Sequence, residues 1–290
     1  MEKVLVIADL HGEFNPFLSD ISLKNRFQEW KGILSVGDFV CRQCVVCLNP
    51  NGYHRRNCSH CSYFDDRWIH DGIGAIVERL GNPNTLFPLP LINVDGNAEY
   101  IVEQMWPTWR SELMGQYPTL KLLGGFEVTQ VGSLKVLSLP FNIRRVLGIP
   151  KRATIGDIKH VIRPIVAEIR AKFGVPDVVL SHYPPNGVAD VSRNLRTRMI
   201  EHLGSNTVRS FLEEMQPPIA ICGHLHYYQR GRLGSSFVFT LTRPLTTTQI
   251  SRKRTSRTLT NYLIIEVEKR GYNINIFVQG NTQETFFVPN

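Results

Sequence analysis

Several features are missing from this sequence of 290 residues, and each absence narrows the class of protein. No apolar run approaches the roughly 20 residues that a membrane-spanning helix needs, so we expect neither a transmembrane segment nor a membrane partner. The first residues enter an apolar stretch with no basic leader before it, which favours an intracellular, cytoplasmic protein over a secreted one. Internal repeats and low-complexity linkers are also missing, which excludes repeat arrays and disordered spacer proteins.

The composition is that of a globular protein with an excess of positive charge. Hydrophobic residues make up 42% of the chain, charged residues 20%, and the formal net charge is +8. Residues 142–163 hold six basic side chains against one acid, Asp157, and residues 243–260 hold five basic side chains and no acid. Clustered positive charge attracts phosphates, so we expect a polyanionic partner, although such stretches can also serve solubility alone.

Short apolar runs that alternate with helical segments predict an α/β fold. We expect buried strands at 4–8, 33–36, 91–94, 177–180 and 219–222, because each run is short and rich in β-branched or aliphatic residues. The remaining expected elements are a hairpin of 126–131 with 134–139, strands at 237–241, 262–268, 272–278 and 285–288, and helices from Pro16 to about Trp30 and at 66–80, 98–115, 154–173, 193–203 and 206–215. Pro107 is expected to break one of these helices or to begin a second one, and Pro164 is expected to interrupt another. We expect one domain over residues 1–290 with a small insertion at 41–64.

Side chains that can bind metal follow five of the expected strands. In α/β sheets such groups gather beyond the carboxyl ends of the strands, so residues distant in sequence meet at one edge. The set contains carboxylates, imidazoles and one carboxamide: Asp9, His11, Asp38, Asn97, His182, His224 and His226. These ligands suit manganese, iron or zinc better than calcium, and seven ligands exceed what one tetrahedral ion needs. The sequence therefore predicts two divalent transition-metal ions, about 3.5–4 Å apart and bridged by one carboxylate.

In order along the chain, these residues resemble the motifs of the calcineurin-like metallophosphoesterase superfamily. The matching blocks are Asp9 with His11, Gly37 with Asp38, Gly96 with Asn97, Ser181 with His182, and Gly223 with His224 and His226. The resemblance implies a two-sheet sandwich flanked by helices. It also implies that Asp9, His11 and His226 hold the first metal, that Asn97, His182 and His224 hold the second, and that Asp38 bridges both.

The activity that the resemblance implies is hydrolysis of a phosphodiester, in which a hydroxide bridging the two metals attacks the phosphorus. Asp38, Asn97 and His224 are then the catalytic residues. The third block departs from the family, because Ala98 stands where a histidine usually follows the asparagine. That histidine is thought to protonate the leaving group, so its absence favours a phosphodiesterase or nuclease over a monoesterase. The alternative is a silent scaffold or binding protein, as in the retromer subunit of this superfamily. His60, His70, Glu99, His160 and His202 are candidates to replace the missing acid.

The expected insertion at 41–64 is rich in cysteine. Five of the six cysteines lie between Cys41 and Cys61, in two Cys-x-x-Cys knuckles that match a structural zinc site. We predict one zinc ion held by Cys44, Cys47, Cys58 and Cys61. Cys41, His54 or His60 remain possible substitutes, and an iron–sulfur cluster or disulfides are the alternatives. The sixth, Cys222, is expected in the core.

Basic side chains near the expected metal site are candidates to bind substrate. Arg55 and Arg56 lie within the insertion beside Tyr53 and His54, and Arg144 and Arg145 lie in the first basic stretch. Basic and aromatic side chains together suit phosphates and stacked bases, so the predicted substrate is a nucleic acid or a nucleotide. The sequence does not define the oligomeric state.

Overall fold

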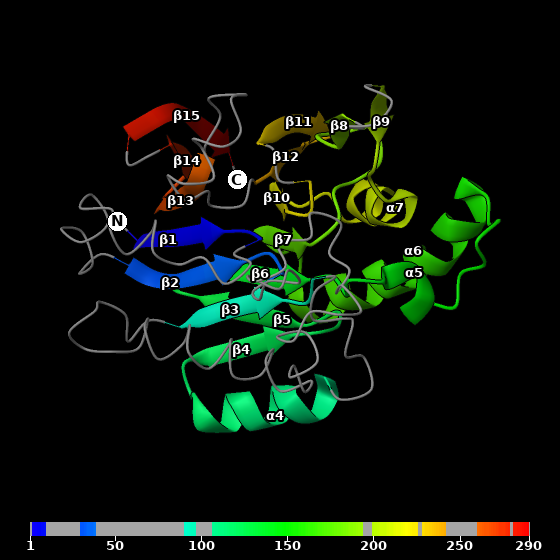
Figure 1. Ribbon diagram of the computed structural model, residues 1–290, viewed down its shortest axis with the longest axis horizontal. Helices are drawn as coiled ribbons and strands as arrows, with labels where there is room; N and C mark the ends of the chain where they lie inside the picture. The colour runs from blue at the N-terminus through cyan, green and yellow to red at the C-terminus, as the bar shows by residue number, and fades with distance from the viewer. Residues whose placement is uncertain are drawn as a thin grey trace, which may run out of the picture.

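The structure, a computed structural model, describes residues 2–9, 30–38, 90–96, 106–193, 199–225, 228–241, 260–278 and 281–289. Within them, two stacked β-sheets form the body of the molecule, with helices on the outside (Figure 1). The first sheet has the strand order β15 (Asn281–Pro289), β14 (Gly271–Val278), β13 (Thr260–Glu268), β1 (Glu2–Ile7), β2 (Trp30–Ser35), β3 (Leu91–Val94) and β4 (Leu120–Leu123). The second has the order β11 (Gln229–Leu233), β12 (Ser236–Thr240), β10 (Ile219–Cys222), β7 (Val178–Ser181), β6 (Leu134–Ser138) and β5 (Val128–Val131). The predicted two-sheet α/β architecture is confirmed.

The central strands of both sheets and the edge strand β4 run parallel, and the other outer strands are antiparallel. β1 to β4 are parallel neighbours in the first sheet, as are β12, β10, β7 and β6 in the second. The strands at 262–268, 272–278 and 285–288 were expected, and they form the antiparallel run β13 to β15, which joins the first sheet through β1. Parallel strands need covered faces, which explains their continuous apolar runs.

Alternate residues of the second sheet face two different cores. Val178, Leu180, Ile219 and Ile221 pack between the sheets against Val4, Val6, Leu34, Val36, Ile92 and Val94 of the first sheet. Their neighbours Val179, Ala220 and Cys222 face the helices instead. This side-chain alternation, with a period of two residues, makes both faces of the second sheet apolar. Cys222 is fully buried, as expected, and burial raises the pKa of its thiol.

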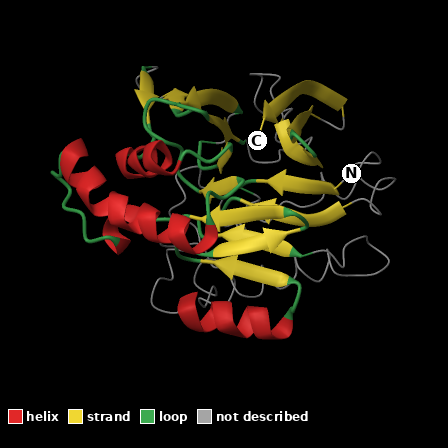
Figure 2. Ribbon diagram, turned by 180° about the vertical axis from the view of Figure 1, so that it is seen from behind, coloured by secondary structure: helices red, strands yellow, loops and turns green. Residues whose placement is uncertain are grey.

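The described helices are α4 (Trp106–Gln116), α5 (Ile143–Val146), α6 (Ile155–Phe173) and α7 (Asn206–Met215). Figure 2 shows α5, α6 and α7 grouped on one side of the sheets and α4 beyond β4. Thr154 and Asp157 form a capping box at the start of α6, and Ser205 caps α7. α6 continues through Pro164, where a break was expected. Its buried face, Ile158, Ile162, Val166 and Ile169, holds it against α7 and the sheet.

Two expectations about secondary structure are wrong, and one strand was missed. The described residues of the expected helix at 193–203 are not helical, since β8 (Val191–Arg193) and β9 (Ile200–His202) form an antiparallel pair. Trp30 begins β2 and does not end a helix. β11, rich in arginine and glutamine, was not expected because it is a polar edge strand.

The pairing of β8 with β9 is held by a buried carboxylate. Both oxygens of Asp190 accept hydrogen bonds, from the backbone N–H groups of Gly187 and Gly204 and from Nδ1 of His202 at 2.7 Å. These contacts outweigh the local helical pattern. The expected helix at 66–80 and the cysteine-rich insertion lie outside the described residues. No helix in the described ranges combines the length and apolar character that crossing a membrane requires.

Candidate metal centre

Four of the seven predicted metal ligands lie within the described residues, and each follows a strand at the same edge of the two sheets. Asp9 follows β1, Asp38 follows β2, His182 follows β7 and His224 follows β10. His11, Asn97 and His226 lie outside the described residues. The site therefore lies at the ends of parallel strands from both sheets, as the order of these strands predicts.

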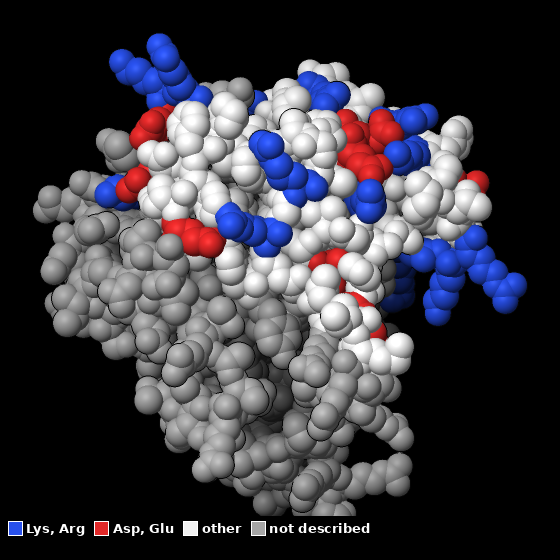
Figure 3. Space-filling view, turned by 90° about the horizontal axis from the view of Figure 1, so that it is seen from above, with Lys and Arg blue, Asp and Glu red and all other residues white. Residues whose placement is uncertain are grey.

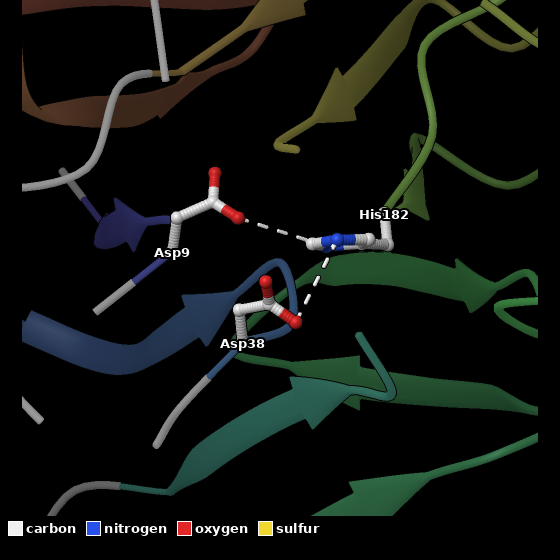
Figure 4. Close-up of side chains that lie close together, drawn as sticks. All are labelled: Asp9, Asp38 and His182. Atoms are coloured by element: carbon white, nitrogen blue, oxygen red, sulfur yellow. Dashed lines mark ion pairs between the residues drawn. The ribbon is translucent and has the colours of Figure 1, made fainter. Parts of the chain in front are cut away.

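Asp9, Asp38 and His182 form a compact buried cluster (Figure 4). Their candidate ligand atoms all lie within 4.8 Å of one another. Nδ1 of His182 lies 3.8 Å from Oδ1 of Asp9, and Nε2 lies 3.7 Å from Oδ1 of Asp38. The side chains of Asp9 and His182 are fully buried and that of Asp38 is 2% exposed. Two carboxylates so close together in a buried place favour a bound cation.

The tautomer of His182 fits metal binding. Its Nδ1 lies 3.0 Å from the carbonyl oxygen of Val36. A carbonyl oxygen only accepts, so we assign the ring proton to Nδ1. In the neutral ring the lone pair then belongs to Nε2, which faces the carboxylate of Asp38. Two electron-pair donors 3.7 Å apart, with the imidazole held by a backbone carbonyl, are the arrangement that a shared or adjacent metal ion requires.

The backbone of the last motif orients the aspartate of the first. The N–H of His224 donates to both carboxylate oxygens of Asp9, at 3.1 and 2.8 Å. The rings of His224 and His182 lie 5.2 Å apart between centroids. A residue 215 positions away thus helps to fix Asp9, which is why the motifs act as one set.

Three of the predicted ligand residues adopt a backbone conformation that is uncommon for them. Asp9, Asp38 and His224 have φ angles of 49°, 47° and 72°. Left-handed backbone costs non-glycine residues of order 1–3 kcal/mol each and persists where the surroundings enforce it. The fold therefore holds these side chains in position before any ion binds.

Two glycines of the motifs are required by close packing around the ligands. A Cβ at Gly223 would lie 2.7 Å from Oδ2 of Asp9, and one at Gly37, where φ is +78°, would lie 2.5 Å from Nδ1 of His182. The same Cβ would lie 2.7 Å from Cα of Gly96, so the third motif adjoins the second at this point. Glycine at both positions therefore permits the close approach of the neighbouring groups.

Some residues that shape the site were not predicted from the sequence. Oδ1 of Asn93, a fully buried residue within β3, accepts from the N–H of Gly37 at 3.3 Å and so supports the turn before Asp38. A polar residue inside a short apolar strand was the available signal. Tyr183 lies against His224, with ring centroids 4.2 Å apart. Its position directly after His182 could have indicated this.

The other predicted residues are only partly placed. Arg144 donates from its guanidinium to the carbonyl oxygens of Ile149 and Pro150, while Arg145 is exposed on α5. His160 is exposed on α6, and His202 bonds to Asp190. The substrate and acid roles of these four residues stay predictions. Arg55, Arg56, His60, His70, Glu99 and Cys41, Cys44, Cys47, Cys58 and Cys61 lie outside the described residues.

The positive charge of the first basic stretch is partly matched by acids. Lys159 pairs with Glu213 at 2.8 Å and Arg163 with Glu214 at 3.1 Å. Figure 3 shows basic side chains spread over the described part of one face, several of them beside acidic ones. Residues 243–259 of the second stretch lie outside the described residues.

Comparison with known proteins supports the family. The model of the calcineurin-like phosphoesterases matches residues 2–228. TT1561 of Thermus thermophilus is 12% identical, with a TM-score of 0.51 over 83% of this chain and 89% of that one. GAP50, the anchor in the inner membrane complex of Plasmodium, is 10% identical, with a TM-score of 0.54 over 99% and 88%.

A further crystal structure is 13% identical, with a TM-score of 0.60 over 96% of this chain and 98% of that one. Similarities at this level of identity establish the fold only. No curated protein sequence matches the chain. The match over residues 2–228, with Asp9, Asp38 and His182 gathered at one edge, shows that the chain belongs to the calcineurin-like phosphoesterase family, whose members generally bind two divalent metal ions and hydrolyse phosphoesters.

Proposed function

We propose that this protein is a dinuclear metal-dependent phosphodiesterase that acts on a nucleic acid or a nucleotide. The observation that carries the proposal is the buried cluster of Asp9, Asp38 and His182. The donor set mixes carboxylate oxygens with imidazole nitrogen, which suits manganese, iron or zinc. Asn97, His11 and His226 complete the proposed set of seven ligands together with His224.

The residues of the site have different roles in the proposed reaction. Bound ions would supply an activated water and neutralise charge on the phosphoryl oxygens. Asp38 would serve both ions, and the contact of its carboxylate with Nε2 of His182 at 3.7 Å supports this role. Asp9 is kept as an acceptor by the N–H of His224, and burial of the cluster keeps bulk water away from these charges.

Ala98 favours a diester over a monoester. Alanine has no proton to donate. The third motif therefore supplies no general acid to protonate the leaving oxygen. Substrates whose leaving group departs easily should therefore react best. The net charge of +8 supports a polyanionic substrate.

The first experiment compares a diester with a monoester. Protein loaded with manganese is expected to hydrolyse bis(p-nitrophenyl) phosphate faster than p-nitrophenyl phosphate, and Asp38→Asn should lower the rate by about a hundredfold or more. Asp157→Asn, which alters only the exposed cap of α6, is the matched control. Equal activity in Asp38→Asn and the wild type would refute the proposal.

A second candidate is a silent scaffold with the same fold. GAP50, which has a similar fold, is described as an anchor. Metal analysis of the purified protein separates the two. Two transition ions in the main site, plus about one zinc that is lost in Cys58→Ser, support the enzyme, while an empty main site supports the scaffold. A panel of mononucleotides, cyclic nucleotides, single strands and duplexes would then define the substrate.

A further inference from the structure

An aromatic pair lies at the same edge of the second sheet as the metal centre. Ser138 of β6 and Leu180 of β7 are register partners, and Phe141 and Tyr183 each follow three residues later. The N–H of Leu139 donates to the carbonyl oxygen of Leu180 at 2.8 Å and extends the pairing past the strand. The topology therefore delivers two aromatic side chains to one place, next to His182.

The two rings stack on each other and reach both histidines of the site. Phe141 and Tyr183 have centroids 5.2 Å apart and planes inclined by 24°, which is a stacked arrangement. Tyr183 lies 4.2 Å from the ring of His224, and Phe141 lies 5.7 Å from the ring of His182. A group that stacks on this pair would be within a few ångströms of the metal ligands.

The two rings differ in what lies around them. Both rings are half-buried, but Tyr183 packs against the core beneath the helices, whereas Phe141 belongs to neither core of the described residues. Tyr183 is therefore the inner ring of the pair, next to the core, and Phe141 is the outer ring. α5 begins directly after this turn and carries the exposed Arg145.

We propose that Phe141, backed by Tyr183, is the platform on which a nucleobase of the substrate stacks, next to the phosphate that is cleaved. This proposal rests on the phosphodiesterase function proposed above and names its specificity. Every base has a π-face, so an aromatic platform accepts bases without reading their identity. Base and phosphate of one nucleotide are separated by a single sugar, which matches a platform that borders the ligand histidines.

The test uses two diesters with the same leaving group, thymidine 5′-(p-nitrophenyl phosphate) and methyl p-nitrophenyl phosphate. The wild type is expected to prefer the nucleoside ester in kcat/KM, mainly through KM. Phe141→Leu keeps an apolar side chain but removes the π-face, so the preference should fall about tenfold. Phe141→Trp should keep or increase it. Phe126→Leu, which alters a stacked pair with Phe211 away from the site, is the control.

A second readout does not depend on catalysis. Binding of thymidine 5′-monophosphate, followed by saturation-transfer NMR on metal-free protein, should weaken in Phe141→Leu and persist in Phe141→Trp. If both diesters lose rate equally in Phe141→Leu and nucleotide binding is unchanged, Phe141 only supports the histidines and the platform proposal is wrong. If the wild type hydrolyses neither diester, the phosphodiesterase proposal fails instead, and the NMR comparison alone then decides for or against the platform.

Discussion

A Cβ on Gly37 would lie 2.5 Å from Nδ1 of His182, the nitrogen that faces the carbonyl of Val36. The ring of His182, a predicted metal ligand, occupies the space that this glycine leaves open. The geometry of the predicted metal site therefore depends on a residue that has no side chain.

Gly37→Ala should abolish loading of the main site. The added methyl meets the ring of His182 and the backbone of Gly96, and the left-handed φ adds roughly 1–2 kcal/mol of strain. Gly148→Ala isolates the strain, because Gly148 also has a positive φ, of 63°, but open space around its Cα. Metal content and thermal unfolding should both fall in Gly37→Ala, and only stability should fall, modestly, in Gly148→Ala. Full metal content in Gly37→Ala would contradict the packing argument.

Asp38→Asn should make the metal-free protein more stable while it removes metal binding. The change eliminates one of two buried neighbouring carboxylates, and asparagine tolerates left-handed backbone. In chelator, a gain of about 1–2 kcal/mol in the free energy of unfolding is expected. Asp190→Asn is the matched comparison. That carboxylate is also buried and accepts from Gly187, Gly204 and His202, so its loss should destabilise. Denaturant titrations in which both variants lose stability would rule out the idea.

Stability should show a pH dependence that comes from Glu213. Lys159 and Arg209 each donate to this carboxylate at 2.8 Å. These contacts, with Lys159 the stronger influence, lower the pKa of Glu213 below its ordinary value near 4.5. Because the pKa is lower in the folded state, the stabilisation is complete above the pKa of the unfolded state. It is lost as the pH falls through the pKa of the folded state. Glu213→Gln should therefore cost roughly 0.5–1 kcal/mol at neutral pH and almost nothing in strong acid. Urea titrations across this range would show curves for wild type and variant that converge at low pH; a constant gap would exclude the ionic origin.

Tyr272→Phe should weaken the contact between the two sheets. The hydroxyl of Tyr272, in the first sheet, donates to Asp177 at 2.5 Å, and the same carboxylate accepts from the N–H of Lys135 in the second sheet. Burial, together with Asp177, raises the pKa of Tyr272, so the hydroxyl remains a donor throughout the physiological range. We expect a loss of about 1.5–3 kcal/mol, typical of a hydrogen bond to a charged group. Tyr228→Phe removes a longer contact of 3.4 Å to Glu284 and should cost less. Chemical denaturation of both variants tests the difference.

The sequence predicted the parts of the fold that local signals define. β3 and β10 were expected with the bounds that they have, because short apolar runs end at Asp95 and Gly223, and α7 begins where Ser205 caps it. Asp9, Asp38, His182 and His224 were predicted as ligands since parallel strands bring their ends together.

The failures lie where distant contacts decide. The helix expected at 193–203 includes Met199 and Ile200, yet these residues are 66% and 71% exposed beside the β8–β9 pair, where His202 bonds to Asp190. The aromatic pair beside the site depends on the register of β6 with β7, which no local pattern reveals. Side-chain tautomers and positive φ angles are likewise consequences of packing.

The pairing of β1 with β13 has a consequence for how the protein is made. Lys3 of β1 faces Glu266 of β13, so the strand that carries Asp9 obtains its antiparallel neighbour only after more than 260 residues have been synthesised. During synthesis, the edge of β1 that pairs with β13 stays unpaired while the other predicted metal-binding motifs are translated. Contacts of such sequence separation slow folding and prolong exposure to aggregation. Assembly of the predicted metal centre should therefore wait until β13 has been synthesised.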